Sequence, residues 1–211
     1  MSDSRLAELE RVTGSVSRET FERLTAFQAL FEKWSARINL AAPSTLPGMW
    51  SRHILDSAQI WPMAPDAKTW LDLGSGGGFP GIVLAILLRE RPGASLAMVE
   101  SSRKKAAFLR SAVAQAAAPA VVHAARIEDF ALRNPGTVDV VTARALAPLP
   151  ALLGLARPWL EAGATAIFHK GRDYRREIEE SRDAWQFDLV EHPSVIDAAS
   201  VILEINDLKK R

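Results

Sequence analysis

A run of closely spaced glycines, set between two apolar segments, constrains the fold of this chain more than any other feature. Residues 70–81 have the sequence Trp-Leu-Asp-Leu-Gly-Ser-Gly-Gly-Gly-Phe-Pro-Gly, and the apolar stretch 82–88 follows directly. Glycine lets the backbone turn sharply and lets a ligand approach bare main chain, because no Cβ stands in the way. Pro80 presets φ for a first helical turn, where its missing N–H costs nothing. The segment therefore predicts strand, tight loop and helix, with a nucleoside-type cofactor at the helix N-terminus.

Segments of strand length alternate with segments of helix length around this loop. Strands are predicted over 68–73, 95–100, 120–125, 138–143 and 165–169, and two more over 187–190 and 201–205. Helices are predicted over 82–88, 103–116, 149–160 and 174–184. Such alternation indicates an α/β fold whose mostly parallel sheet is covered on both faces. Because no helix-length segment separates the last two strands, we expect a seven-stranded, Rossmann-like sheet with one antiparallel strand.

The first 62 residues are predicted to be helical and to precede this alternating part. Apolar side chains recur every three or four residues over 21–38, which is the spacing of one face of a long amphipathic helix. Pro43, Pro47 and Gly48 interrupt this pattern before a second, shorter helix over 50–60. We therefore divide the chain into an N-terminal helical extension (1–62), packed on a main domain (63–211).

Composition excludes several classes of protein. The 211 residues include no cysteine, which excludes disulfides, thiolate zinc sites and cysteine nucleophiles, and no cluster with metal-ligand spacing is seen. The formal net charge is +1, so any surface for nucleic acid must be local. The N-terminus lacks an apolar signal core, and the apolar run 82–88 is too short to cross a membrane. We expect a cytoplasmic protein with no membrane partner, and a monomer because nothing demands a dimer.

Two cofactors compete for the glycine loop. Residues 76–81 satisfy G-x-G-x-x-G, the dinucleotide fingerprint, and Glu100 would then hold a ribose at the end of the second strand. A nicotinamide-dependent oxidoreductase is therefore one hypothesis. However, Asp72 completes the pattern Asp-x-Gly-x-Gly-x-Gly, which is typical of S-adenosylmethionine-dependent methyltransferases. In addition, Phe79 and Pro80 occupy the place where a pyrophosphate needs clear approach to the helix.

Acids after three successive strands favour the methyl donor over a dinucleotide. Asp72 and Glu100 end the first and second strands, and Glu128 follows the third, where methyltransferases of this fold hold the adenine. The methyl donor carries no phosphate, so carboxylates around it do not repel it. The alternative is that Glu100 and Glu128 merely cap the helices that follow them.

The segment after the fourth strand narrows the choice of methyl acceptor. Pyrimidine C5 methylation needs a cysteine nucleophile, which this chain lacks. Enzymes that methylate exocyclic amines commonly carry Asn/Asp-Pro-Pro-aromatic at this place, whereas residues 142–149 are Thr-Ala-Arg-Ala-Leu-Ala-Pro-Leu. Arg144 would repel a developing ammonium, but it can donate to guanine O6 or N7. Guanine N7 has no proton to remove, so its methylation needs alignment and charge compensation rather than a general base.

Five strings of residues carry a resemblance to a known family. They are Asn39-Leu40, Arg52-His53-Ile54-Leu55-Asp56-Ser57, the glycine loop 71–81, Arg144-Ala145-Leu146-Ala147-Pro148-Leu149 and Lys170-Gly171. In order and spacing they resemble the bacterial 16S ribosomal RNA methyltransferase G family, also called the glucose-inhibited division protein B family. The resemblance implies a class I methyltransferase fold. It also implies methyl transfer from S-adenosyl-L-methionine to N7 of one guanosine, nucleotide 527 in the 530 loop of 16S ribosomal RNA. The chain departs from the family at Ala41 and Ala143, where threonine and serine are usual.

The resemblance and the motifs together predict which residues form the site. For the cofactor, the resemblance implies Gly74, Phe79, Ile127, Glu128 and Arg144, and the glycine pattern and the order of strands add Gly76, Gly78 and Glu100. The predicted catalytic, acceptor-side residues are Asn39, His53, Asp56 and Lys170, together with Arg144, which would lie between donor and acceptor. For His53, a purely structural role, bonded to its own helix or to Asp56, is an equal alternative.

Basic side chains gather in three places despite the small net charge. These are the helix 103–110, the segment 170–176 and the last three residues, 209–211. Contact with RNA phosphates explains such clusters, and a solvated helix face is the alternative for each. So small a net charge predicts weak binding to naked RNA. Since the resemblance implies 16S ribosomal RNA, the expected partner is this RNA or a small-subunit ribosomal particle, and we expect the particle to be the real substrate. A third hypothesis, a non-catalytic RNA-binding protein with a vestigial pocket, is disfavoured by the intact loop and acids.

Overall fold

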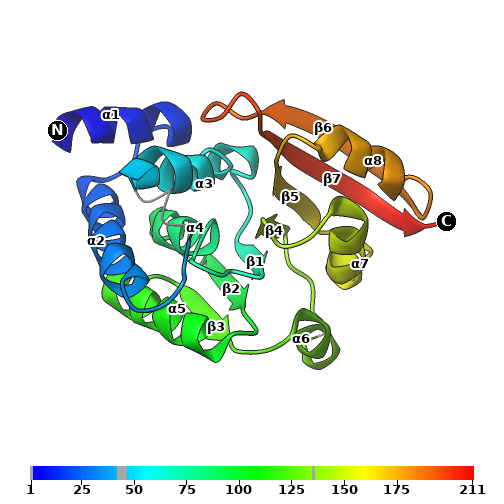
Figure 1. Cartoon of the computed structure of the whole chain (residues 1–211), viewed down its shortest axis with the longest axis horizontal. Helices are drawn as coiled ribbons and strands as arrows, with labels where there is room; N and C mark the ends of the chain where they lie inside the picture. Colours follow the sequence, from blue (N-terminus) through cyan, green and yellow to red (C-terminus); the bar gives the residue numbers. More distant parts are fainter. Residues whose placement is uncertain (1, 42–46, 135) are drawn as a thin grey trace.

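A twisted β-sheet runs through the middle of the protein (Figure 1). The computed structural model describes residues 2–41, 47–134 and 136–211. Within these residues seven strands form one sheet in the order β3-β2-β1-β4-β5-β7-β6. Their bounds are β1 (Thr69–Leu73), β2 (Ser95–Val99), β3 (Ala120–His123), β4 (Val140–Arg144), β5 (Thr165–Lys170), β6 (Trp185–Pro193) and β7 (Val201–Lys210). Only β7 runs antiparallel to its neighbours β5 and β6, so the predicted seven-stranded sheet with one antiparallel strand is confirmed.

The strands differ in burial, and this difference explains which of their bounds the sequence predicted well. The central strands β4 and β5 are buried along almost their whole length, so they appear in the sequence as continuous apolar runs. The edge strand β6 alternates buried or half-buried with exposed residues over nine positions. The prediction of 187–190 was therefore too short, because a search for apolar runs misses the outward-facing polar residues of an edge strand. The prediction of 201–205 likewise covered only the first half of β7.

Two hydrophobic clusters cover the two faces of the sheet. One contains α4 (Gly81–Leu87) and α5 (Arg103–Ala116), and the other contains α6 (Ile127–Arg133), α7 (Leu149–Leu160) and α8 (Tyr174–Ser181). Successive residues of β1 alternate between the clusters, because side chains of a strand point to opposite faces. The bounds of α5 and α7 agree with the predictions. Helix α6 was not predicted, since its seven residues are too few to show a helical period.

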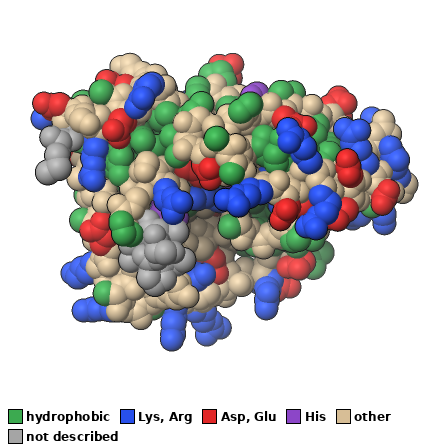
Figure 2. Space-filling view, turned by 45° about the horizontal axis from the view of Figure 1, so that its top comes forward, with side chains coloured by type: hydrophobic (Ala, Val, Ile, Leu, Met, Phe, Trp, Pro, Cys, Tyr) green, Lys and Arg blue, Asp and Glu red, His purple; other side chains and the backbone are tan. Residues whose placement is uncertain are grey.

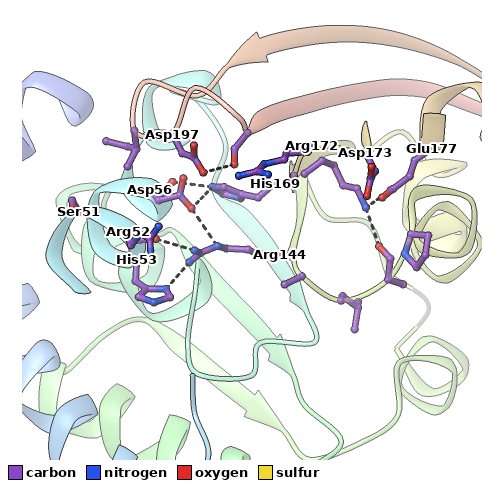
Figure 3. Close-up of a pocket in the computed structure, with 18 residues that line it drawn as sticks. Ser51, Arg52, His53, Asp56, Arg144, His169, Arg172, Asp173, Glu177 and Asp197 are labelled. Carbon is purple, nitrogen blue, oxygen red and sulfur yellow. Dashed lines mark hydrogen bonds and ion pairs between the residues drawn. The ribbon is translucent and has the colours of Figure 1, made fainter. Parts of the chain in front are cut away.

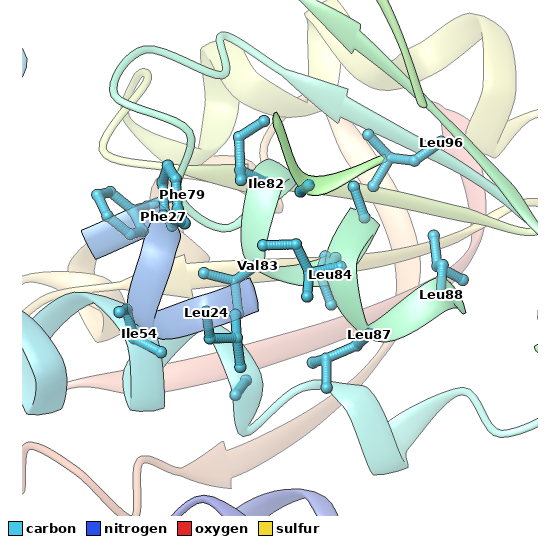
Figure 4. Packing of buried hydrophobic residues seen from close by; sticks show 14 of the residues in the cluster. Leu24, Phe27, Ile54, Phe79, Ile82, Val83, Leu84, Leu87, Leu88 and Leu96 are labelled. Carbon is cyan, nitrogen blue, oxygen red and sulfur yellow. The ribbon is translucent and has the colours of Figure 1, made fainter. Parts of the chain in front are cut away.

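The N-terminal part is helical, as predicted, and shares a core with the sheet. It comprises α1 (Ser2–Thr13), α2 (Arg18–Ser35), a π-helical turn η2 (Trp50–Leu55), α3 (Asp56–Ala58) and a short turn η3 (Trp61–Met63). The apolar face of α2 packs on α4, where Leu24 and Phe27 join Phe79, Ile82 and Val83 in one cluster (Figure 4). The hydrophobic core therefore extends across the proposed boundary between residues 62 and 63. The division of the chain at this boundary stays a prediction.

Two predictions about the N-terminal helices need correction. Helix α2 ends at Ser35, so Ile38 lies beyond it, and the predicted helix over 50–60 is a π-helical turn followed by α3.

A polar contact fixes the start of α2 to the main domain. The hydroxyls of Ser17, the N-cap of α2, and of Thr20 both donate to the Glu90 carboxylate. The predicted helix breaker Pro43 lies outside the described residues.

Candidate functional site

Two neighbouring cavities open at the carboxyl ends of the parallel strands. The first, which we call the glycine-loop cavity, has a volume of about 520 Å³ and is lined by the loops after β1, β2, β3 and β4. The second, the β5-side cavity, has a volume of about 860 Å³ and is lined by η2, the ends of β4 and β5 and the β6–β7 loop. The two cavities share four lining residues, His53, Arg144, Ala145 and Leu146. A ligand in one would therefore adjoin a ligand in the other.

The glycines of the loop serve two different purposes. Gly76 lines the cavity with φ +52°, and a Cβ built on it would meet only the Gly74 carbonyl oxygen, at 3.6 Å. Four other glycines are needed because the protein itself packs against them. A Cβ at Gly74, Gly77, Gly78 or Gly81 would approach Leu146, the Leu40 carbonyl oxygen, Ile82 or Asp72 to within 2.5–2.8 Å. Close internal packing, as well as access for a ligand, thus explains the glycine run.

Buried carboxylates hold this loop in place from two sides. Glu100 lines the cavity, and its oxygens accept from the backbone N–H groups of Gly76 (2.8 Å) and Ser102 (2.7 Å). Ser102 is the N-cap of α5, so the alternative capping role of Glu100 holds in part; a carboxylate still has further lone-pair sites for a ligand. Asp72 lies beneath the loop, fully buried, and accepts from the Thr142 hydroxyl at 2.8 Å. Burial raises the pKa of Asp72 to about 6.

Arg144, the last residue of β4, occupies the junction of the two cavities. Its Nε lies 3.2 Å from Asp56 Oδ2, its Nη1 lies 3.1 Å from His53 Nδ1, and its Nη2 donates to the Arg52 carbonyl oxygen at 2.8 Å (Figure 3). Burial lowers the pKa of Arg144 and the Asp56 charge raises it, and a guanidinium stays ionised in either case. Three contacts with one segment therefore orient the guanidinium plane.

The contact with Arg144 also fixes the protonation of His53. Because a guanidinium can only donate, the Nδ1 atom of His53 must accept, which leaves the proton of the neutral ring on Nε2. Burial, followed by the charges of Arg144 and Arg52, lowers the pKa of His53 to about 4. The ring stacks on Phe79 at a centroid distance of 4.9 Å. His53 is therefore neutral near pH 7, and its side chain bonds Arg144 rather than Asp56, which was the alternative.

A family model described as rRNA small subunit methyltransferase G matches residues 20–205. The chain belongs to this family. A Chelativorans relative (strain BNC1) is 60% identical over 210 residues, with all of both chains covered, and a Brucella canis relative is 59% identical, with 98% of its length covered. Both are named ribosomal RNA small subunit methyltransferase G. The resemblance noted in the sequence is thereby confirmed.

Solved structures of methyltransferases share the fold at low sequence identity. A Podospora anserina methyltransferase bound to S-adenosylhomocysteine gives a TM-score of 0.63 at 14% identity, covering 97% of this chain and 94% of that one. A Bacillus cereus O-methyltransferase, also in complex with S-adenosylhomocysteine, gives 0.59 at 15% identity, covering 98% and 100%. These likenesses confirm the predicted methyltransferase-type α/β fold.

Most residues that the sequence assigned to the cofactor line the glycine-loop cavity. They are Gly74, Gly76, Phe79, Glu100, Ile127, Glu128 and Arg144. Ile127 is buried and Glu128 is exposed in the first turn of α6. Gly78 is not among the described lining residues and packs on Ile82 instead. Which of these residues contact a cofactor stays a prediction.

The residues assigned to the acceptor side divide in the same way. His53, Asp56, Arg144 and Lys170 line the β5-side cavity, whereas Asn39 is exposed and is not among the described residues that line either cavity. Lys170 is held in place, because its ammonium pairs with Glu177 at 2.5 Å and donates to the Ala147 carbonyl oxygen at 3.0 Å. The segment 170–176 therefore presents Arg172, rather than Lys170, as an exposed cation at this cavity.

Sequence reasoning missed several residues of the β5-side cavity. His169 donates from Nε2 to the Asp56 carbonyl oxygen at 2.8 Å, and its pKa is lowered, chiefly by burial. Glu177 and Asp197 also line the cavity. The position of His169 directly before the Lys170-Gly171 string was an available signal, whereas Asp197 lies in a loop without any motif. Across the described ranges, the structure contains no helix long and apolar enough to span a membrane and no three-residue acid or histidine cluster suited to a metal ion.

Proposed function

We propose that this protein transfers a methyl group from S-adenosylmethionine to N7 of guanosine 527, in the 530 loop of 16S ribosomal RNA. Membership of the rRNA small subunit methyltransferase G family supports this activity. The observation that carries the proposal is the shared wall of the two cavities, formed by His53 and Arg144. A methyl donor on one side of this wall and a guanine on the other would be neighbours.

The glycine-loop cavity fits the methyl donor. Gly76 exposes bare backbone to it, Glu100 has lone-pair sites left for ribose hydroxyls, and Ile127 offers an apolar surface beside Glu128 for the adenine. When bound, the donor supplies an electrophilic methyl group. The residues of this chain would align the donor with the acceptor and exclude water. Alignment matters because bringing two reactants into position accounts for a large share of the barrier to such a transfer.

The β5-side cavity fits a purine whose nucleophilic nitrogen, N7, carries no proton. Among the described contacts, Nη1 and Nη2 of Arg144 each make one hydrogen bond and Nε faces Asp56 as an ion pair, so the remaining N–H groups of the two Nη atoms suit an acceptor such as guanine O6. The guanine gains positive charge as N7 is methylated. The Asp56 carboxylate, 3.2 Å from Arg144, offsets the charge of that arginine, so the junction does not repel the product. The neutral His53 adds no further positive charge.

The surface around the β5-side cavity suits RNA. Lys and Arg side chains gather near the centre of the face in Figure 2, and both Arg52 and Arg172 are exposed lining residues of this cavity. Such cations position RNA phosphates without base specificity. We propose that the substrate is a small-subunit particle in the cytoplasm and that the enzyme acts on it as a monomer.

Mass mapping of 16S RNA from cells with and without this gene tests the proposed reaction. The guanosine in the 530 loop should lose its methyl group only in the cells that lack the gene. A methyl group in both would disprove the proposal. Calorimetry with S-adenosylhomocysteine and with NADH addresses the oxidoreductase alternative, and we expect binding of the first compound and none of the second.

A further inference from the structure

The side-chain amide of Gln59, directly after α3, is buried and fully occupied by hydrogen bonds. Its Nε2 donates to Asp56 Oδ1 at 2.8 Å, to the Asp56 carbonyl oxygen at 3.0 Å and to Ser194 Oγ at 3.1 Å. Its Oε1 accepts from the Val195 N–H at 3.0 Å and from the Ser194 hydroxyl at 3.3 Å. Only 8% of the residue is exposed. One amide thus joins α3 to a loop 135 residues further along the chain.

The bond from Gln59 to Asp56 bears directly on Arg144. Gln59 occupies Oδ1 of the carboxylate, and Oδ2 is the atom that faces Arg144 Nε. Two partners on two different oxygens fix the carboxylate plane, whereas one partner alone would leave it free to rotate. Since Asp56 in turn helps to orient Arg144, Gln59 controls the guanidinium through one intermediate side chain.

The bonds from Gln59 to the β6–β7 loop bear on the rim of the β5-side cavity. The Ser194 hydroxyl, which Gln59 contacts, also accepts from the N–H groups of Ile196 and Asp197. Ile196, Asp197 and Ser200 line the β5-side cavity. The loop is further closed by the Asp197 carboxylate, which accepts from Ala199 N–H and from the Ser200 hydroxyl. The anchored end of this loop therefore sets where its cavity-lining part lies.

We propose that Gln59 is a positioning residue that couples the rim of the acceptor cavity to Arg144. Through Asp56 it holds the guanidinium at the junction, and through Ser194 and Val195 it holds the β6–β7 loop at the mouth of the same cavity. Its effect on catalysis rests on the proposed function, whereas its effect on the loop does not. The β6–β7 loop and Arg144 are thereby fixed relative to each other.

The variant Gln59→Met tests this role, because it keeps the length of the side chain and removes every hydrogen bond of the amide. We expect kcat on small-subunit particles to fall roughly 10- to 50-fold and KM to rise about fivefold, in the range of lost alignment. The affinity for S-adenosylhomocysteine should fall much less than kcat, since Gln59 does not line the glycine-loop cavity and reaches it only through Arg144. Ser194→Ala removes the hydroxyl part of the loop connection and leaves the bond from Gln59 to Asp56, so it should raise KM and leave kcat nearly unchanged.

The control is Gln115→Met, which removes an exposed amide of α5 that donates to the Ala26 carbonyl oxygen of α2 at 3.3 Å. It should leave kcat, KM and the affinity for S-adenosylhomocysteine unchanged. If Gln59→Met loses S-adenosylhomocysteine affinity in the same proportion as kcat, the amide serves only general stability and the proposal is wrong. Unchanged kinetics of Gln59→Met would overturn it equally.

Hydrogen exchange separates a failure of this inference from a failure of the proposed function. The Val195 amide, which donates to Gln59, should exchange at least tenfold faster in Gln59→Met than in the wild type, and no faster in Gln115→Met. This readout needs no RNA and no methyl transfer. If Gln59→Met does not fold, Gln59→Leu replaces it, because leucine also removes every hydrogen bond of the amide and adds no charge beside Asp56. Unaltered exchange around 194–200 in the folded variant contradicts the coupling.

Discussion

The two cavities meet at Arg144 but are constructed in opposite ways. The glycine-loop cavity is lined by the short loops after four strands, and the protein packs closely on four glycines of the loop after β1. The β5-side cavity is made of charged and polar side chains from η2, β4, β5 and the β6–β7 loop, which contact one another through ion pairs. Substitutions that add atoms to a glycine should therefore disrupt the glycine-loop cavity. Substitutions that truncate a charged side chain should disrupt the β5-side cavity.

Arg144→Ala removes the side chain on which the β5-side cavity depends most, and it should have the largest effect. We expect turnover to fall about 10³-fold, as for the loss of a preorganised donor. Stability should fall by about 3 kcal/mol as well, since the largely buried Asp56 is left unpaired. Steady-state kinetics on particles and urea unfolding measure the two effects.

The double variant Arg144→Ala/Asp56→Asn is the control for this substitution. It removes the unpaired charge, so it should regain part of the lost stability and none of the lost turnover. Recovery of turnover together with stability would mean that Arg144 matters for folding alone.

Adding one methyl group to the glycine loop gives the matched experiment in the other cavity. Gly76→Ala places a Cβ at φ +52° on the cavity wall, and the affinity for S-adenosylhomocysteine should fall about tenfold. Gly77→Ala brings a Cβ to 2.8 Å from the Leu40 carbonyl oxygen, on the protein side of the loop. It should lower the melting temperature by several degrees, for a cost of about 1–3 kcal/mol. Calorimetry measures the affinity and thermal melts measure the stability. A larger loss of affinity in Gly77→Ala than in Gly76→Ala would contradict the different purposes proposed for these two glycines.

Lowering the pH should weaken the β5-side cavity through His53. The pKa of His53 falls from its ordinary 6.5 to about 4 on folding, so between these values the unfolded chain binds the proton more readily. This contribution to the free energy of unfolding is fully present above pH 6.5 and is lost progressively as the pH falls toward 4. His53→Asn keeps an acceptor near the Nδ1 position and does not titrate, so its stability should decline less with falling pH.

Urea unfolding of both proteins at pH 7.5, 6.5 and 5.5 measures this difference. Folding raises the pKa of Asp72 from 3.8 to about 6, so its contribution to the free energy of unfolding falls as the pH rises between these values, opposite to that of His53. Asp72 is present in both proteins, so its contribution cancels in the comparison. Parallel curves for wild type and His53→Asn would show that His53 does not contribute to the decline.

Removing an exposed cation from the rim should have the smallest effect. Arg172→Ala should raise KM for the particle about two- to threefold and reduce the slope of log affinity against log salt by about one, with kcat unchanged. Arg157→Ala, on α7 and outside both cavities, is the matched control and should leave KM unchanged. An equal rise in KM for both variants would indicate a general charge effect.

The contrast between the cavities also explains what the sequence could predict. The glycine loop, Glu100 and Glu128 follow strands in a regular order, so chemistry and spacing placed them near one cavity in advance. Gln59 and Asp197 have no comparable signal, because their roles arise only when α3 and the β6–β7 loop meet in space. His53 was predicted on the basis of a family string, but its contact with Arg144 required the tertiary structure.

The shared core of α2 and α4 has a consequence for synthesis of the chain. Translation delivers α2 first, and the helices that cover its apolar face, α4 and α5, end only at Ala116. At about 5–20 residues per second, the stripe with Leu24 and Phe27 stays uncovered for several seconds. An unfinished chain therefore exposes the apolar face of α2 to water before α4 and α5 have been synthesised. We expect nascent chains that end before α4 to be held by chaperones, and chains that extend past α5 to be released.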